Sequence, residues 1–329
     1  MSEPTGAAPH VSVIVAARDA EATLPRTLAG LQGQQIDVPF EVIIVDNGSL
    51  DETAAVAENH SLKPRVIRRR RGEGAGAARN DGAASAAGSV LAFTDSDCEP
   101  DPTWLAEGLR AISGADLVQG SVSAAPDAAV GPYDRTLWVA SEYGLYETAN
   151  LFVRRDWFER LGGFQDLVPD KGKPGRAARP FGEDAWFAWR ARRMGARTAF
   201  GQNARVYHAV FPGSAYDYIA EGWRLRHFPE LVSRIPELRD VFAWRRWFLS
   251  SRTAAFDVAV VGVIAAVALR SFLPLAAIAP YAVAVESAVR GAARRRRELI
   301  PLAAVNSLRD AVGFLGLLVG SVRARSALL

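Results

Sequence analysis

Cysteine and lysine are almost missing from this sequence of 329 residues. Cys98 is the only cysteine, so no disulfide bond can form within the chain, which suits a reducing compartment such as the cytoplasm. Residues 1–10 contain acids and prolines but no apolar core, so we expect a disordered N-terminus and no signal peptide. Neither a Ser–His nor a Cys–His arrangement suggests a covalent nucleophile.

The net charge is also small, because 39 lysines and arginines face 36 aspartates and glutamates, which gives +3. Arginine supplies nearly all of the positive charge, and it gathers beside the apolar C-terminal part of the chain. This pattern favours an anionic membrane surface as a partner and argues against nucleic acid. The heavy use of alanine and arginine is typical of a GC-rich bacterial genome.

Strands and helices alternate along the first part of the chain. Apolar runs at 11–15, 40–45, 65–67 and 89–94 predict strands, and helical patterns lie between them. The sequence therefore predicts an α/β fold with a doubly wound, mostly parallel sheet. Three of these strands end in polar residues, which meet at the edge where open α/β sheets bind ligands.

The triplet Asp95-Ser96-Asp97 closes the most apolar of these strands. Its two carboxylates suit a hard divalent cation such as Mg²⁺ or Mn²⁺, which in turn can hold a diphosphate. An Asp-x-Asp triplet alone is weak evidence, because many solvent-exposed turns contain one.

Five blocks of the sequence, taken together and in order, resemble the family 2 glycosyltransferases, which share the GT-A fold. The blocks are VSVIVAARDAEATL, EVIIVDNGSLDET, GAGAARNDGAASAAGSVLAFTDSDCEPDPTWL, NLFVRRDWFERLGGF and FGEDAWFAWRARRMG. The resemblance runs from Val11 to about His208. It implies a sugar donor activated as a nucleoside diphosphate, a divalent metal ion, and inversion at the anomeric carbon.

The resemblance also implies where the nucleotide base binds. Ala16, Ala17 and Arg18 follow the first strand, and the small alanines let the backbone come close to a planar base. Asp46 can accept a hydrogen bond from the base, such as one from uracil N–H. A helix cap or an Asx-turn is the plain structural alternative for Asp46. Family members often have an aromatic and an acidic residue where this chain has Arg18 and Ala20, so the choice of base stays open.

Arg79 resembles the family's arginine before an asparagine, and we expect it to contact the diphosphate beside the Asp95-Ser96-Asp97 triplet. A surface arginine on a helix is the alternative. The glycines at 72–76 do not form a Rossmann fingerprint, because they follow the third strand rather than the first.

The acidic pair Glu183-Asp184 opens an aromatic helix. An acid pair at this position commonly stabilises the helix start. The resemblance assigns a different role to Asp184, that of the general base that removes a proton from the acceptor hydroxyl, with Glu183 beside it. His208 follows a late strand, where several related enzymes carry a metal ligand, and a structural histidine is the alternative. We expect Cys98 to be a small packed residue.

The C-terminal third changes in composition. Residues 211–253 are amphipathic, aromatic and basic, and we assign them to the acceptor or membrane interface. The apolar stretches at 254–269 and 272–289 predict a membrane hairpin with a turn at Arg270-Ser271. The arginines at both outer ends place these ends in the cytoplasm. The stretch at 299–322 has Asn306, Arg309 and Asp310 at its middle, so we expect it to lie in the interface or pack on the other helices.

The sequence thus predicts four regions: a disordered N-terminus (1–10), a GT-A nucleotide-sugar-binding domain (11–210), an interface region (211–253) and membrane-associated helices (254–329). A buried helical domain in a soluble protein is the alternative for the last of these. We expect a lid in the loop at Lys171–Arg176. The predicted enzyme transfers a sugar, with UDP as the expected nucleotide, to a membrane-linked glycan or lipid at the cytoplasmic membrane face. The alternatives are a polyprenyl-phosphate sugar synthase and a non-catalytic nucleotide-sugar-binding protein.

Overall fold

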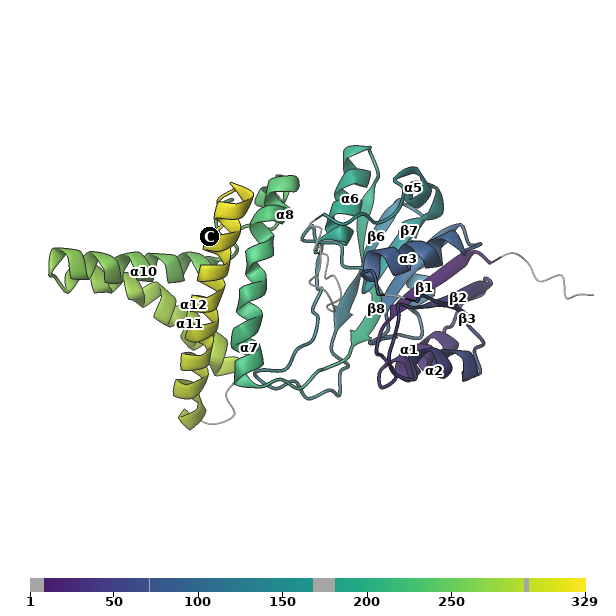
Figure 1. Ribbon diagram of the computed structural model, residues 1–329, viewed down its shortest axis with the longest axis horizontal. Helices are drawn as coiled ribbons and strands as arrows, with labels where there is room; N and C mark the ends of the chain where they lie inside the picture. The colour runs from purple at the N-terminus through teal and green to yellow at the C-terminus, as the bar shows by residue number, and fades with distance from the viewer. Residues whose placement is uncertain (1–8, 71, 168–180, 293–295) are drawn as a thin grey trace, which may run out of the picture. The chain divides into compact units, whose positions relative to one another are not determined.

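The computed structural model describes residues 9–70, 72–167, 181–292 and 296–329 (Figure 1). The lid expected at Lys171–Arg176 and the arginines at 294 and 295 lie outside these residues. The chain divides into two units, the first formed by Met1–Ala128 and Thr136–Ala209, the second by Ala129–Arg135 and Val210–Leu329.

Strands and helices alternate in the first unit, as the apolar runs predict. Its elements are β1 (Val11–Ala17), α1 (Leu24–Gln32), β2 (Phe40–Asp46), α2 (Thr53–Asn59), β3 (Arg65–Arg68), α3 (Ala75–Ala84), β4 (Val90–Asp95), β5 (Cys98–Pro100), α4 (Trp104–Ile112), β6 (Leu117–Ser123), β7 (Asn150–Arg154), α5 (Arg155–Arg160), α6 (Glu183–Arg193) and β8 (Thr198–His208).

The strands of the first unit form one sheet of eight strands in the order β3-β2-β1-β4-β7-β6-β8-β5. The neighbours β3, β2, β1 and β4 are parallel, and so are β6 and β8. β7 runs antiparallel to β4 and β6, and β5 runs antiparallel to β8. The expected α/β fold with a mostly parallel sheet is therefore confirmed.

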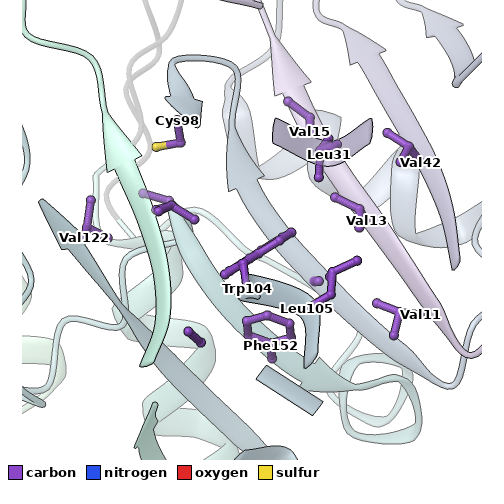
Figure 2. Close-up of a cluster of buried hydrophobic side chains, with 14 of the residues drawn as sticks. Val11, Val13, Val15, Leu31, Val42, Cys98, Trp104, Leu105, Val122 and Phe152 are labelled. Carbon is purple, nitrogen blue, oxygen red and sulfur yellow. The ribbon is translucent and has the colours of Figure 1, made fainter. Parts of the chain in front are cut away.

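Both faces of this sheet are buried, because alternate residues of each strand point to opposite sides. Val11, Val13 and Val15 of β1 face one core, which α1 and α4 cover and which also holds Trp104 and Phe152 (Figure 2). Ile14 faces the other core, where residues of α3, α5 and α6 pack. Helices on both faces are what a doubly wound fold requires.

A buried asparagine holds the middle of the sheet together. Asn150 at the start of β7 is fully buried and donates through Nδ2 to the carbonyl oxygens of Ser121 and Ala204, each at 2.8 Å. Its Oδ1 accepts from Trp104 Nε1 at 2.9 Å. Gly120 is required beside it, because a Cβ there would lie 2.3 Å from Asn150 Nδ2.

The second unit is helical. It contains α7 (Ala215–Glu221), the 3₁₀ turn η1 (Gly222–His227), α8 (Phe228–Arg234), α9 (Leu238–Val241), α10 (Ser251–Leu269), η2 (Leu273–Ile278), α11 (Ala279–Ala292), η3 (Arg296–Glu298) and α12 (Leu299–Ala324). Arg270 ends α10 in the left-handed conformation, where the hairpin turn was expected. Among the described residues, the segments Ser251–Leu269, Leu273–Gly291 and Arg296–Ala324 are long and apolar enough to cross a membrane.

Candidate active site

The carboxyl ends of β1, β2 and β4 bring the residues predicted to bind the sugar donor to one edge of the sheet. In the parallel register, Ala17 of β1 lies opposite Asp46 of β2, and Ala16 lies opposite Asp95 of β4. Ser96 and Asp97 follow in the turn between β4 and β5. The carboxyl edge of the sheet therefore holds residues from three separate blocks of the sequence.

Arg79 connects the two acidic clusters. Its Nη2 donates to Asp95 Oδ1 at 2.6 Å, and its Nη1 lies 3.4 Å from Glu183 Oε1. Burial by itself would lower the pKa of Arg79, but the negative charges of Asp95 and Glu183 outweigh burial and raise it. This guanidinium is therefore charged and fixed, and the acidic triplet and the acidic pair lie on the two sides of one buried arginine.

Gly76 makes this approach possible. It lies in the first turn of α3, and a Cβ there would come within 3.2 Å of Glu183 Cγ and 3.4 Å of Phe164 Cβ. The glycine-rich segment thus lets α3 pack closely against the start of α6. This packing role differs from that of a dinucleotide-binding loop.

Asp97 and His208 form a second pair, which the antiparallel pairing of Cys98 with His208 brings together. Nε2 of His208 lies 3.6 Å from Asp97 Oδ2. Nδ1 of His208 lies 2.7 Å from the carbonyl oxygen of Ala209, which can only accept, so Nδ1 carries the proton. In the neutral ring, Nε2 then presents a lone pair toward a carboxylate.

This pair fits a divalent cation. A nitrogen lone pair and a carboxylate repel each other unless a proton or a cation lies between them. A metal-binding histidine usually donates its other ring N–H to a group such as a backbone carbonyl, as His208 does here. Two adjacent ligand atoms of an octahedral ion lie about 3.0 Å apart. The distance of 3.6 Å between His208 Nε2 and Asp97 Oδ2 is slightly longer than that. Within the described ranges, no group of three or more His, Cys, Asp or Glu side chains is arranged to hold a metal ion. Phosphate oxygens and water would have to supply the other ligands.

Asp46 and Arg18 lie at the side of the edge where we expect the base. Asp46 is buried, and its Oδ1 accepts from the Ser49 backbone N–H at 3.0 Å, which holds the turn after β2. The guanidinium of Arg18 packs against Gly72, because a Cβ on Gly72 would lie 2.2 Å from Arg18 Nη1. Neither geometry identifies the base.

Asp184 has an unusual environment for an aspartate. Burial raises its pKa well above the ordinary value, and the negative charges of Glu183 and Glu147 raise it further. Two influences oppose this shift: Ala185 N–H donates to Asp184 Oδ1 at 2.8 Å, and the positive charge of Arg79 lowers the pKa of Asp184. Burial also raises the pKa of Glu183 despite the charge of Arg79. A carboxyl whose pKa lies closer to neutrality is a better general base than an exposed one.

Glu147 and Tyr143 belong to this environment, although no motif in the sequence marks them. The Tyr143 hydroxyl donates to Glu147 Oε1. No described residue donates to the buried Glu147 Oε2. Their segment is tied to α6, because Trp189 Nε1 donates to the Gly144 carbonyl at 2.9 Å and Arg192 Nη1 lies 2.9 Å from the Tyr146 hydroxyl. Burial raises the pKa of Glu147 as well.

Asn80 and Cys98 have structural roles. Asn80 makes two hydrogen bonds with the backbone of Phe164, at 2.8 and 2.9 Å, and so ties α3 to the chain that leads to α6. Cys98 is fully buried, and burial together with the charges of Asp95 and Asp97 raises the pKa of its thiol well above the ordinary value. This thiol is therefore unreactive, as expected for a small packed residue.

Known proteins are similar to this chain in sequence and in fold. Residues 12–165 match the model of the family "Glycosyl transferase family 2". The glycosyltransferase AglE of Haloferax volcanii is 34% identical over an alignment of 182 residues, and the match covers 51% of this chain and 60% of that protein. The chain thus spans less than two thirds of the curated relatives that it matches.

Two groups of solved structures share the fold. The mannosyltransferase PcManGT of Pyrobaculum calidifontis, in complex with GDP-Man and Mn²⁺, superposes with a TM-score of 0.55 at 19% identity and covers 98% of this chain and 90% of its own. Residues 1–349 of TarS from S. aureus, in complex with UDP-GlcNAc, superpose with a TM-score of 0.51 at 18% identity and cover 96% and 92%. The fold is GT-A, and residues 12–165 of the chain match the family 2 glycosyltransferases.

Proposed function

We propose that this protein is a metal-dependent, inverting glycosyltransferase of the cytoplasmic membrane face. It moves a sugar from a nucleoside-diphosphate sugar, with UDP as the nucleotide, to a hydroxyl of a membrane-linked glycan or lipid. The observation that carries the proposal is the position of Arg79 between Asp95 and Glu183. One buried side chain thus joins the residues proposed for the donor to those proposed for the acceptor.

The donor half of the proposal uses the carboxyl edge of the sheet. Ala16, Ala17, Arg18 and Asp46 bind the base, while Arg79 fixes the orientation of Asp95 beside the diphosphate. Asp97 and His208 would hold a divalent cation, Mn²⁺ or Mg²⁺, and its charge would stabilise the departing nucleoside diphosphate. A nitrogen ligand favours Mn²⁺ over Mg²⁺, which prefers oxygen. The neighbour that binds GDP-Man was solved with Mn²⁺, which supports this choice.

The acceptor half uses Asp184. Its carboxylate removes the proton from the acceptor hydroxyl while that oxygen bonds to the anomeric carbon. The bond from this carbon to the diphosphate oxygen breaks at the same time, so the sugar inverts and no covalent enzyme intermediate forms. Glu183 and Glu147 keep the pKa of Asp184 raised. Three acids around the acceptor also repel an anionic phosphate, so a hydroxyl acceptor is favoured over a polyprenyl phosphate.

The Asp184→Asn substitution tests this assignment. Removal of a general base typically lowers turnover by about two to four powers of ten. We expect that loss in the release of nucleoside diphosphate by membranes that supply the acceptor, with donor binding unchanged in a thermal-shift assay. Asp156→Asn is the matched control, because Asp156 also lies in the first turn of a helix but is exposed and pairs with Arg160. Retained turnover in Asp184→Asn would mean that the acceptor needs no base, as a phosphate does.

A further inference from the structure

The three apolar helical segments of the second unit are not equivalent. In α12, polar residues interrupt the middle of the helix and bond to the start of α10. Arg252 Nη2 lies 2.7 Å from Asp310 Oδ2 and donates to Asn306 Oδ1 at 3.0 Å. Asp310 also accepts from the Tyr281 hydroxyl at 2.8 Å. The middle of α12 and the first turn of α10 are therefore at the same depth in any membrane.

The start of α10 belongs at the edge of the hydrocarbon layer. Ser250 and Thr253 form a capping box there, and Arg252 lies in the first turn. The 19 residues of α10 extend about 28 Å, close to the thickness of the hydrocarbon core. If α10 crosses the bilayer, the middle of α12 lies at the surface.

The end of α12 is on the same side as the start of α10. After Ala324 the chain turns back, and Leu329 N–H donates to the Trp247 carbonyl at 2.8 Å. Arg239 Nη2 donates to Ser326 Oγ at 2.9 Å and to the Ala327 carbonyl at 2.8 Å. Arg239 and Trp247 both precede α10, so the C-terminal tail and the entry to α10 share one side.

The beginning of α12 is on that side too. If α10 crosses the bilayer and η2 and α11 return, then Arg296 and the start of α12 are back where α10 began. In Figure 1, α10 runs across the direction of α12 rather than alongside it, so a bilayer that α10 crosses would hold α12 near its plane. A helix with both ends on one side does not cross.

The packed face of α12 also argues that this helix does not cross the membrane. Gly313, Gly316 and Gly320 let η1 approach, since a Cβ on Gly320 would lie 2.2 Å from the Arg226 carbonyl oxygen. η1 carries Arg224, Arg226 and His227. A spanning α12 would draw these charged residues into hydrocarbon, where they are strongly disfavoured.

The opposite face of α12 is apolar and exposed. At about 100° per residue, the side away from the three glycines presents Ile300, Leu308, Leu315, Leu318 and Val322, all of which are exposed. An apolar stripe along one side is typical of a helix that lies in the plane of the membrane interface.

We propose that α12 is a surface helix whose exposed stripe binds the acyl-chain boundary of one leaflet, while the hairpin of α10, η2 and α11 alone crosses the bilayer. The partner of this surface is therefore the lipid bilayer itself, on the side of the catalytic unit. This proposal rests on the membrane location included in the proposed function, and its test does not depend on activity.

Labelling of single cysteines with a membrane-impermeant maleimide tests the topology of the full-length chain in sealed vesicles of both orientations. Buried Cys98 makes the unsubstituted protein the unlabelled control. We expect Arg297→Cys and Ala327→Cys, at the two ends of α12, to react from the same side as Ser113→Cys in the catalytic unit. Ser271→Cys at the hairpin turn should react only from the other side.

The opposite results would overturn the proposal. Reaction of Arg297→Cys and Ala327→Cys from opposite sides would show that α12 crosses the membrane. Reaction of Ser271→Cys from the side of Ser113→Cys would show that the hairpin does not cross. Loss of transferase activity in any variant would not change the conclusion about the topology of α12 or of the hairpin.

A depth measurement tests the stripe directly. Nitroxide labels on Leu308→Cys and Val322→Cys, about 21 Å apart along the helix, should report the same shallow depth by relaxation with oxygen and a water-soluble nickel complex. Depths that differ by about 20 Å would show a transverse α12, and labels in bulk water would show that lipid does not contact the stripe. Val263→Cys on α10, exposed in the structure, provides the deep reference.

Discussion

Asp184 is the residue whose ionisation most directly limits the proposed reaction. The base must be ionised to accept a proton, so turnover rises as pH rises through the pKa of Asp184. Burial, Glu183 and Glu147 raise that pKa. We therefore expect the acidic limb of the kcat/KM profile to lie above the pKa of an ordinary aspartate, which is about 3.9.

Glu147→Gln removes one of the charges that raise the pKa of Asp184. The acidic limb of the profile should therefore move to lower pH, while donor binding in a thermal-shift assay stays the same. Glu159→Gln is the control, since Glu159 is exposed on α5 and pairs with Arg155. A limb that stays in place or moves to higher pH in Glu147→Gln would disprove the role given to Glu147.

At the residue scale, the motifs of the sequence indicated Asp95, Asp97 and Asp184 but not Glu147. Nothing in the residues around Glu147 marks it, because its effect depends on burial against a helix about 40 residues later in the chain. The bridge that Arg79 makes is a similar case. The sequence predicted an arginine beside the diphosphate, whereas its contacts to two carboxylates depend on how closely α3 and α6 pack.

The strands β1 to β4 and the helices between them followed from apolar periodicity, but the order of the strands in the sheet did not. The sequence predicted parallel strands at 11–15, 40–45 and 89–94, and these are β1, β2 and β4. It did not predict that β7 enters antiparallel between β4 and β6. Such an order depends on contacts between distant segments, such as those of Asn150, which leave no periodic pattern.

Packing between α4 and β7 gives a test at the element scale. A Cβ on Gly108 of α4 would lie 2.1 Å from Phe152 Cζ, inside the core of Figure 2. Gly108→Ala should therefore destabilise the protein by about 1–3 kcal/mol, although alanine favours helices. Thermal unfolding of the purified protein in detergent measures this. Gly114→Ala is the control, because nothing lies within 4 Å of a Cβ there, and an equal melting temperature for both variants would contradict the packing.

At the scale of the whole molecule, the composition of the C-terminal third predicted a hairpin and a separate third helix. The second apolar stretch is divided into η2 and α11, which agrees with the helix-breaking effect of Pro274 and Pro280. Sequence alone left α12 open between the interface and packing on other helices. The contacts of its polar middle and of the C-terminal tail were needed to argue its position.

The exposed apolar hairpin leads to a prediction about the whole protein. Val261, Val267, Phe272 and Leu273 each expose more than 60% of their surface, and lipid is the environment that suits them. The full-length protein should stay in the membrane pellet after an alkaline carbonate wash, which removes proteins held only by charge. Its appearance in the supernatant would contradict a membrane-inserted hairpin.

Calorimetric titration with nucleotide-sugars, with and without Mn²⁺, measures whether the donor binds together with a metal ion at Asp97 and His208. We expect a UDP-sugar to bind the full-length protein in detergent only with the metal. Asp97→Ala and His208→Ala should abolish this binding, while Asp156→Asn should preserve it. GDP- and TDP-sugars in the same series identify the base. Equal binding without the metal, or undiminished binding in Asp97→Ala, would rule out the proposed metal-dependent donor site.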